Sequence, residues 1–346
     1  MVVNTMVITL GLVIVMILVL ASVFVNGWTD APNAIATVVS TRVMSPRAAV
    51  IMAAIFNLFG VLLMGTAVAN TIGNICKLVP GNEALAVIGA AQLSIVLWAT
   101  AAWRFGIPTS ESHALIAGLT GAGLASSRVD VVGFAAVDWD SWVKVFQGLG
   151  ISSVLGFFSG FVITWLVVFV FKRTSRGAAN SFFSKAQVVS AAAMAFSHGT
   201  QDGQKFMGVM ALSLMLGGVL PPNTDGKLSI PLWIMLLCSV IMALGTSVGG
   251  YRIIKTMGMD MVKLEKYQGF SAEVAASLCL LGSTVFGIPV STTHTKTTAI
   301  MGVGLQKGFR GIKWSIVMEM FTAWVLTFPV CLIIGFLMTK LFLAIF

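Results

Sequence analysis

Long apolar runs, separated by short polar stretches, dominate the chain. Polar residues divide it into ten apolar segments, each close to or above the roughly 20 residues that span a bilayer as a helix. These segments lie at 6–40, 48–70, 84–103, 107–125, 143–171, 187–219, 231–254, 270–286, 288–305 and 314–340. Because the runs are long and do not alternate, the pattern predicts an all-helical polytopic membrane protein and not a barrel. The longest segments are expected to tilt, to break, or to hold two shorter helices.

Composition supports this interpretation. Charged residues make up 10% of the 346 residues and apolar residues 58%, whereas an ordinary soluble domain has roughly 25% charged residues. This scarcity of charge excludes a soluble enzyme, a disordered chain and a nucleic-acid-binding domain, although the net charge is +9. The first apolar run has no positive residues before it and no cleavage pattern, so a retained span is expected. The four cysteines form no CxxC pair, and neither a disulfide framework nor a zinc site is predicted.

Three sequence blocks recur in the same order at a nearly constant offset. FGIPTSESH at 105–113 is repeated as FGIPVSTTH at 286–294, an offset of 181 residues. GTAV at 65–68 matches GTSV at 245–248, and NGWTD at 26–30 matches HGTQD at 198–202. Each half holds five segments, an odd number, so the second half enters the membrane from the opposite side. The chain is therefore predicted to form two inverted-topology repeats with broken helices and half-helix hairpins around a site at the membrane midplane, as in many secondary transporters.

The repeats give a domain division of 1–171 for the N-terminal repeat, 172–186 for a basic linker and 187–346 for the C-terminal repeat. Counting lysines and arginines by loop sets the orientation. With the N-terminus outside, 14 of the 21 lie in inside loops. Five lie in outside loops or the tail: Lys77, Arg128, Lys144, Lys227 and Lys340. Both termini are therefore predicted outside the cell membrane and the linker in the cytoplasm, where it also meets phospholipid.

The few charged residues inside the apolar segments are candidates for function, because a charge at membrane depth is costly. Asp30 and Asn33 are three residues apart and share a face of any helical turn. Gly27 and Pro32 are expected to interrupt that helix and to free backbone carbonyls, which would complete a cation or proton site. In the second copy, Asp202 is followed by a lysine at the place of Asn33.

That lysine, Lys205, brings its own positive charge to Asp202. We predict that Asp30, Asn33 and Asp202 bind the coupling ion, while Lys205 replaces a cation and helps to hold an anion. The alternative is an ion pair between Asp202 and Lys205 that only neutralises two buried charges.

The second duplicated motif predicts two helix starts after Pro108 and Pro289. A helix N-terminus presents free N–H groups and the positive end of the helix dipole, which suits an anion. Hydroxyl side chains at these starts add donors: Ser110, Ser112, Ser291, Thr292 and Thr293. Two such starts from opposite sides could converge on one tetrahedral oxyanion. The alternative is that these residues only cap the broken helix ends.

Other polar residues of the motifs are predicted to support the site. Glu273 aligns with Gln92 at the same offset of 181, and it is either a proton carrier or a structural hydrogen-bonding group. The supporting candidates are Asn26, Thr29, Glu111, His113, His198, Gln201, Glu273 and His294.

These motifs resemble those of the PiT family of inorganic phosphate transporters, across almost the whole chain. The resemblance runs through residues 26–33, 108–113, 196–205 and 289–294, and the stretch FSHGTQDGQK at 196–205 is most similar to the bacterial low-affinity, proton-coupled branch. In sodium-coupled members an Asp and an Asn of each motif are sodium ligands, which implies that role for Asp30, Asn33 and Asp202 but not for Lys205. The family's hydroxyls at the second motif contact phosphate.

The sequence departs from the family pattern at three places. Thr29 and Gln201 stand where the family has Asn before each motif Asp, and Glu111 stands where it usually has Ser or Thr. A carboxylate beside phosphate repels it unless protonated, paired with metal or turned away. The branch also carries neutral metal–phosphate complexes, so Glu111 is expected to favour a cargo that contains a divalent metal.

The sequence thus predicts a secondary transporter, a homodimer in the plasma membrane, that imports inorganic phosphate, free or as a metal complex, together with protons. No enzyme activity, cofactor, resident metal or nucleic-acid partner is expected. The alternatives are sodium coupling, transport of sulfate or another oxyanion, a channel, and an intramembrane enzyme that would use His113, His198 and His294 as metal ligands.

Overall fold

The described part of the chain is almost entirely helical. The computed structural model describes residues 9–345 except 77, 79, 127–136, 222–227 and 249. The helices are α1 (Leu10–Ser40), α2 (Pro46–Leu63), α3 (Ala67–Gly73), α4 (Asn82–Phe105), α5 (Glu111–Ala125), α6 (Trp139–Gly150), α7 (Gly156–Phe171), α8 (Arg176–His198), α9 (Gln204–Leu216), α10 (Leu232–Val248), α11 (Tyr251–Lys255), α12 (Lys266–Val285), α13 (Thr292–Leu305) and α14 (Trp314–Ile345). Wider π-helical turns join α6 to α7 at Ile151–Leu155 and α8 to α9 at Gly199–Gly203.

Helix length and apolar character confirm a polytopic all-helical membrane protein. Five stretches of the described residues are long and apolar enough to cross a membrane, namely α1, α2, α4, Trp139–Phe171 and α14. A sixth exists if α10 and the following helix, bent by 66°, form one span. The predicted segment 48–70 is two helices, α2 and α3. With 15 and 14 residues, α5 and α13 are about 22 Å long and shorter than the roughly 30 Å bilayer core.

Two expectations about chain breaks are wrong. Residues 176–186 of the predicted linker belong to α8, so the turn after α7 is only 172–175. The predicted interruption of the first segment is also missing, because α1 runs unbroken through Pro32. Gly27 serves close packing instead: a Cβ there would lie 2.1 Å from the Met242 carbonyl oxygen of α10. In the second copy the equivalent stretch is the π-helical turn at Gly199–Gly203.

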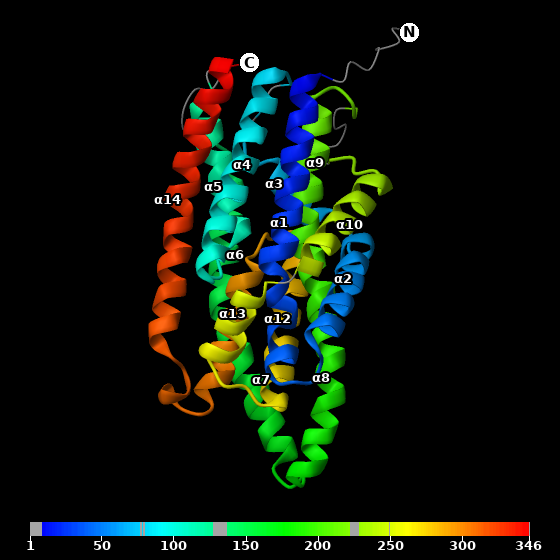
Figure 1. The fold of residues 1–346 in the computed structure, drawn as a ribbon, viewed down its shortest axis with the longest axis vertical. Coiled ribbons are helices and arrows are strands. Elements are labelled where there is room, and N and C mark those ends of the chain that lie inside the picture. The colour runs from blue at the N-terminus through cyan, green and yellow to red at the C-terminus, as the bar shows by residue number, and fades with distance from the viewer. Residues whose placement is uncertain are drawn as a thin grey trace.

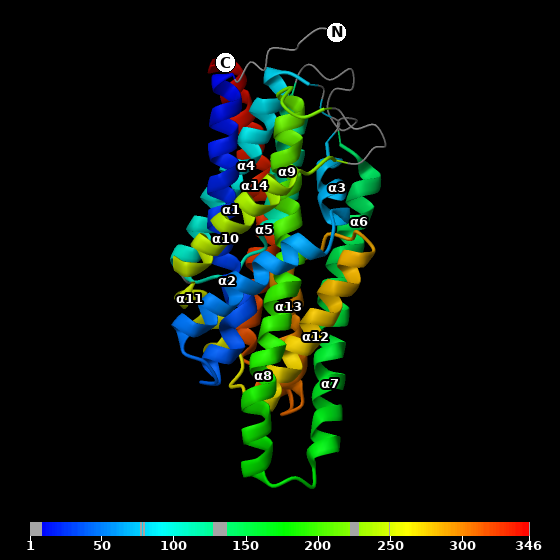
Figure 2. The same cartoon turned by 90° about the vertical axis from the view of Figure 1, so that its right-hand side faces the viewer.

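The described ends of the chain lie together. The start of α1 and the end of α14 are at one end of the molecule, and the turn between α7 and α8 projects from the other (Figures 1 and 2). This relative placement is what the predicted orientation requires, while the assignment of each end to a side of the membrane stays a prediction. Three residues of the outside-loop count, Lys77, Arg128 and Lys227, lie outside the described residues.

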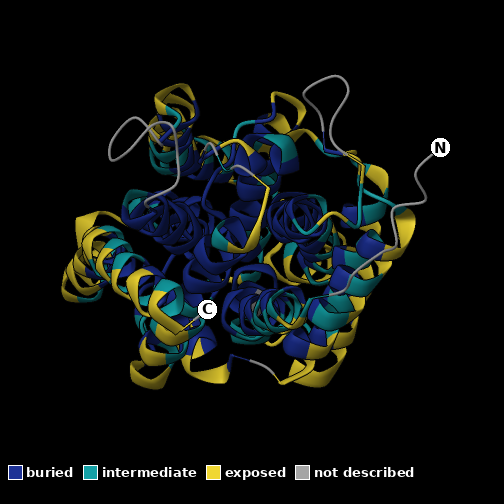
Figure 3. Cartoon of the chain, turned by 90° about the horizontal axis from the view of Figure 1, so that it is seen from above, coloured by how far each residue is buried: buried dark blue, intermediate teal, exposed yellow. Residues whose placement is uncertain are grey.

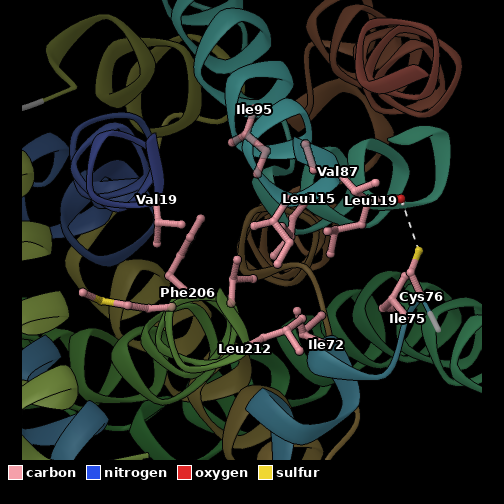
Figure 4. Packing of buried hydrophobic residues seen from close by; sticks show 14 of the residues in the cluster. Val19, Ile72, Ile75, Cys76, Val87, Ile95, Leu115, Leu119, Phe206 and Leu212 are labelled. Carbon is pink, nitrogen blue, oxygen red and sulfur yellow. Dashed lines mark hydrogen bonds between the residues drawn. The ribbon is translucent and has the colours of Figure 1, made fainter. Parts of the chain in front are cut away.

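The buried residues gather at the middle of the bundle and the exposed ones form its rim (Figure 3). Two apolar clusters form much of this core. The first joins α1, α4, α5 and α9 through side chains such as Val19, Ile95, Leu115 and Phe206 (Figure 4). The second joins the C-terminal part of α1 to the C-terminal part of α13, and Ile35 is one of its side chains. The polar motif residues of α1, at 26–33, lie between the two clusters along that helix.

Candidate functional site

The two short helices begin as the sequence motif predicts. The Ser110 hydroxyl accepts a hydrogen bond from the His113 N–H at 3.3 Å, and this caps α5. The Ser291 hydroxyl accepts one from the His294 N–H at 3.2 Å and caps α13. A side-chain oxygen at this position satisfies one of the free N–H groups of the first helical turn. Ser110 and Ser291 therefore have a structural role as helix caps, whether or not they also bind an anion.

A single ammonium group connects the two helix starts. Lys205 Nζ on α9 donates to the Ser112 hydroxyl of α5 at 2.6 Å and to the Val290 carbonyl, just before α13, at 2.6 Å. Its third donor goes to Asp202 Oδ1 at 2.8 Å. An ammonium has three donors, and all three are used here. The side chain of Lys205 is 1% exposed, so this network is shut off from solvent.

Asp202 lies in the π-helical turn and is contacted from three sides. Besides the Lys205 bond, its other oxygen accepts from the Thr292 hydroxyl at 2.9 Å. His198 Nε2 lies 3.2 Å from the same oxygen. The other ring nitrogen of His198 is 3.1 Å from the Asn57 amide oxygen of α2, which orients the ring. The extra residue of a π-turn often marks a functional site, and here it directs Asp202 toward α13.

Asp30 makes the equivalent contacts from α1. One of its oxygens accepts from the Thr293 hydroxyl at 3.0 Å and the other from the Asn26 amide at 3.3 Å. The Asn33 amide donates to the Thr293 hydroxyl at 3.1 Å and more weakly to that of Thr292 at 3.4 Å. Asn33 thereby orients both threonine hydroxyls toward the two carboxylates. We call Asp30, Asn33, His198, Asp202 and Lys205 the central site.

The central site has the composition of a cation site as well. One ligand atom from each of Asp30, His198 and Asp202 lies within 4.8 Å of the others. Carboxylate oxygens and a ring nitrogen suit several cations. The ammonium of Lys205 already satisfies one oxygen of Asp202, so a cation here competes with or adds to that charge.

Glu111 is directed toward α1. The Thr29 hydroxyl donates a hydrogen bond to one of its carboxylate oxygens. The other oxygen is buried without a hydrogen-bond partner among the described residues. The acid at the start of α5 is therefore turned toward the first motif, and one oxygen remains free for a further ligand.

The three histidines do not converge. His198 belongs to the central site, whereas His113 and His294 pack against each other with ring centroids 4.6 Å apart. The His294 ring also lies 3.7 Å from that of Trp324. Because these two rings sit in an aromatic contact, the arrangement does not favour the three-histidine metal centre that an intramembrane enzyme would need.

The remaining supporting candidates fall in two places. Gln201 holds the turn before α13, since its oxygen accepts from the Val290 N–H at 3.3 Å and its amide donates to Thr284 at 2.9 Å. Glu273 lies in a separate buried cluster with Thr37 and Ser190.

Two groups that contact residues of the central site were not predicted from the sequence, namely the Asn57 amide and the Val290 carbonyl. The lone amide of Asn57 in an apolar run was a usable signal, because a polar group at membrane depth calls for an explanation. The Val290 carbonyl could not be predicted, because every residue has a backbone carbonyl and the residue type does not distinguish this one.

Comparisons with known proteins show the family to which the chain belongs. The profile of the phosphate transporter family matches residues 26–179 and 171–335. A "Probable low-affinity inorganic phosphate transporter" of Rhizobium meliloti (strain 1021) is 40% identical over 312 residues, which cover 90% of each chain. A relative of the same name from Bacillus subtilis (strain 168) is 36% identical over 324 residues, covering 93% of this chain and 94% of the relative.

A solved structure titled "The sodium-dependent phosphate transporter" has the same fold. It superposes with a TM-score of 0.86 at 22% identity, over 98% of this chain and 100% of that one. The relatives are named as transporters and not as enzymes. The chain accordingly belongs to the phosphate transporter family.

Proposed function

We propose that the chain is a secondary transporter that imports inorganic phosphate across the plasma membrane in symport with protons. The observation that carries proton coupling is the ammonium of Lys205 bound to Asp202 at 2.8 Å. At the corresponding place in the first half stands Asn33, a neutral amide. A resident positive charge supplies what a co-transported sodium ion would otherwise supply there. A proton taken up and released within the central site is then enough for coupling.

Phosphate is expected to bind where the two short helices begin. Helix N-termini favour anions through their free N–H groups and dipole. The hydroxyls of Ser112, Thr292 and Thr293 and the ammonium of Lys205 already form one network. A bound oxyanion would take donors from this network, and the two halves would then rock around it as inverted repeats. Ser110 and Ser291 support this way of binding phosphate because they cap the N-termini of α5 and α13.

Labelled phosphate uptake into liposomes that contain the purified protein tests the proposal. Three conditions are compared: an inward proton gradient, an inward sodium gradient, and neither. Uptake above equilibrium with the proton gradient alone is expected. Uptake that requires sodium and ignores the proton gradient would refute proton coupling.

Sodium coupling is the second candidate, because the solved structure with this fold is titled as sodium-dependent. The clustered ligand atoms of Asp30, His198 and Asp202 also suit a small cation. The same liposome experiment decides between the two ions, and competition by unlabelled sulfate tests the other oxyanions.

The free oxygen of Glu111 supports a cargo that includes a divalent metal. A carboxylate near phosphate is repulsive unless a cation lies between them. We expect Mg²⁺ to stimulate phosphate uptake, and Glu111→Gln to remove most of that stimulation. Stimulation that is unchanged in the variant would show that Glu111 does not contact the cargo.

A homodimer with both termini outside completes the proposal. The mass of the protein in detergent tests the dimer. Labelling of single cysteines placed at the start of α1 and in the α7–α8 turn, from either side of intact cells, tests the orientation.

A further inference from the structure

A second cluster of buried charged groups lies apart from the central site. Glu273 of α12 and Lys296 of α13 are both 0% exposed. The Thr37 hydroxyl of α1 donates to one carboxylate oxygen of Glu273 and accepts from Lys296 Nζ at 3.3 Å. The other carboxylate oxygen accepts from the Ser190 hydroxyl of α8. Four helices therefore enclose an acid and a base that one hydroxyl group joins. We call these four residues the second cluster.

The fold itself does not need charges at this place. At the offset of 181 residues, the first half has Gln92 for Glu273 and Leu115 for Lys296. Gln92 is equally buried, and its side-chain oxygen accepts a hydrogen bond from the Ser22 hydroxyl at 2.5 Å, while its amide nitrogen has no hydrogen-bond partner among the described residues. The first half thus folds with an uncharged amide and a leucine at these places, while the other half keeps two ionisable groups at membrane depth. Such groups commonly mark ion or proton pathways.

The second cluster is linked to the central site by two helices. Along α1 the polar residues 26, 30, 33, 37 and 41 follow the three- and four-residue spacing of one helix face. Asp30 and Thr37 are therefore separated by about 10 Å along the helix axis. On α13, Lys296 follows Thr293, which binds Asp30, by about one turn. The two groups of polar residues thus lie on a continuous polar face.

The second cluster also reaches toward the surface. One turn beyond Thr37, the Thr41 hydroxyl donates to Gln187 Oε1 of α8 at 2.9 Å. Gln187 is three residues from Ser190, whose hydroxyl bonds both the Gln187 carbonyl and Glu273. Thr41 lines a surface hollow of about 830 Å³ near the α7–α8 turn. This hollow is also lined by basic residues: Lys172, Arg176 and Lys266.

We propose that Glu273 is a second proton-binding site, on the path by which the coupling proton leaves the central site for the cytoplasm. This rests on the proposed proton symport. The Glu273 carboxylate accepts the proton and later releases it to water in the hollow beside Thr41. Lys296 then balances the carboxylate through the Thr37 hydroxyl. Among the described residues, Lys296 is the charged group that acts on Glu273, and α1 and α8 contribute hydroxyl and amide groups.

Glu273→Gln separates net transport from exchange. Net uptake driven by a pH gradient requires the proton to be released inside, whereas exchange of labelled for unlabelled phosphate returns phosphate and proton together. We expect the variant to lose net uptake by about tenfold or more, while exchange at equal pH stays close to that of the unaltered protein. Glu319→Gln on α14, an exposed carboxylate, is the matched control and should change neither activity.

The double variant Glu273→Gln with Lys296→Gln removes the lone ammonium that the single change leaves. It should show the same loss of net uptake with exchange preserved, even if the single variant folds poorly. Normal gradient-driven uptake in either variant would overturn the role of Glu273, as would an equal loss of both activities in a protein that melts normally. If the unaltered protein ignores the pH gradient, the failure lies in proton symport itself, and the second proton site falls with it.

Discussion

Replacing Lys205 by asparagine tests the central site most directly. The change removes an ammonium that makes three short hydrogen bonds, to Ser112, Asp202 and the Val290 carbonyl. Removing one partner of a buried ion pair costs about 3–5 kcal/mol, because the other charge stays buried and uncompensated. We expect Lys205→Asn to lower the free energy of unfolding by that amount and to abolish uptake driven by a proton gradient.

Sodium should restore part of this stability. Lys205→Asn gives the second half the same Asp and Asn spacing as Asp30 and Asn33. A ligand that binds only the folded state stabilises it by about 2.7 kcal/mol at a hundred times its dissociation constant. Sodium chloride is therefore expected to recover half or more of the loss, whereas choline chloride recovers none.

Thermal unfolding of the purified protein in detergent measures both effects, with phosphate uptake recorded alongside. Lys340→Asn, an exposed lysine of α14, is the control and should change stability by less than about 0.5 kcal/mol. A Lys205→Asn protein that melts like the unaltered one and does not respond to sodium would refute the idea that the ammonium replaces a cation.

Five further variants, at four positions, test the packing and the hydroxyl groups. Ser112→Ala removes an acceptor of a charged hydrogen bond, worth about 1.5–3 kcal/mol, and should raise the KM for phosphate about tenfold or more in uptake assays. Thr293→Val leaves the Asp30 carboxylate without its 3.0 Å donor and should slow uptake, whereas Thr293→Ser should preserve it. Gly121→Ala would place a Cβ 2.0 Å from the Leu332 carbonyl oxygen, so a loss of about 1–3 kcal/mol in thermal unfolding is expected. Gly150→Ala meets no atom within 4 Å and should leave stability unchanged or raise it by up to about 1 kcal/mol; equal losses in the two glycine variants would contradict the packing argument.

Residue types at fixed spacing allowed much of the central site to be predicted. The three-residue separation of Asp202 and Lys205 is enough to bring their charged groups together on a helix, and the duplicated proline-led motif indicated the two capped helix starts. The contact between Asn33 and Thr293, 260 residues apart, was not predicted, because only the convergence of the two helix starts was expected. Neither the contact with the Val290 carbonyl nor the orientation of Glu111 toward Thr29 could be predicted, because the residue type does not determine the direction of a backbone carbonyl or the rotamer of a side chain.

The predicted helix boundaries failed for a related reason. Pro32 and Gly27 were expected to break α1, yet proline removes only one backbone donor and glycine also permits close helix contacts. The basic residues after α7 were assigned to a loop by their charge, but residues 176–186 form the first turns of α8, in which Phe183 is buried. Local composition does not distinguish these cases, since the deciding contacts come from distant helices.

The three acceptors around Lys205 also bear on how tightly a transporter couples the flow of its driving ion to the movement of its cargo. A carrier that bound its driving ion without its cargo would let that ion leak across the membrane and waste the gradient that the cell maintains. Here the ammonium is tethered to the chain and cannot cross, and it lies 2.8 Å from Asp202 Oδ1. An incoming oxyanion that draws Lys205 toward itself would free that carboxylate for a proton. In the proposed proton symport, the cargo would have to displace this tethered charge before a proton binds, and ion flow without phosphate would therefore be suppressed.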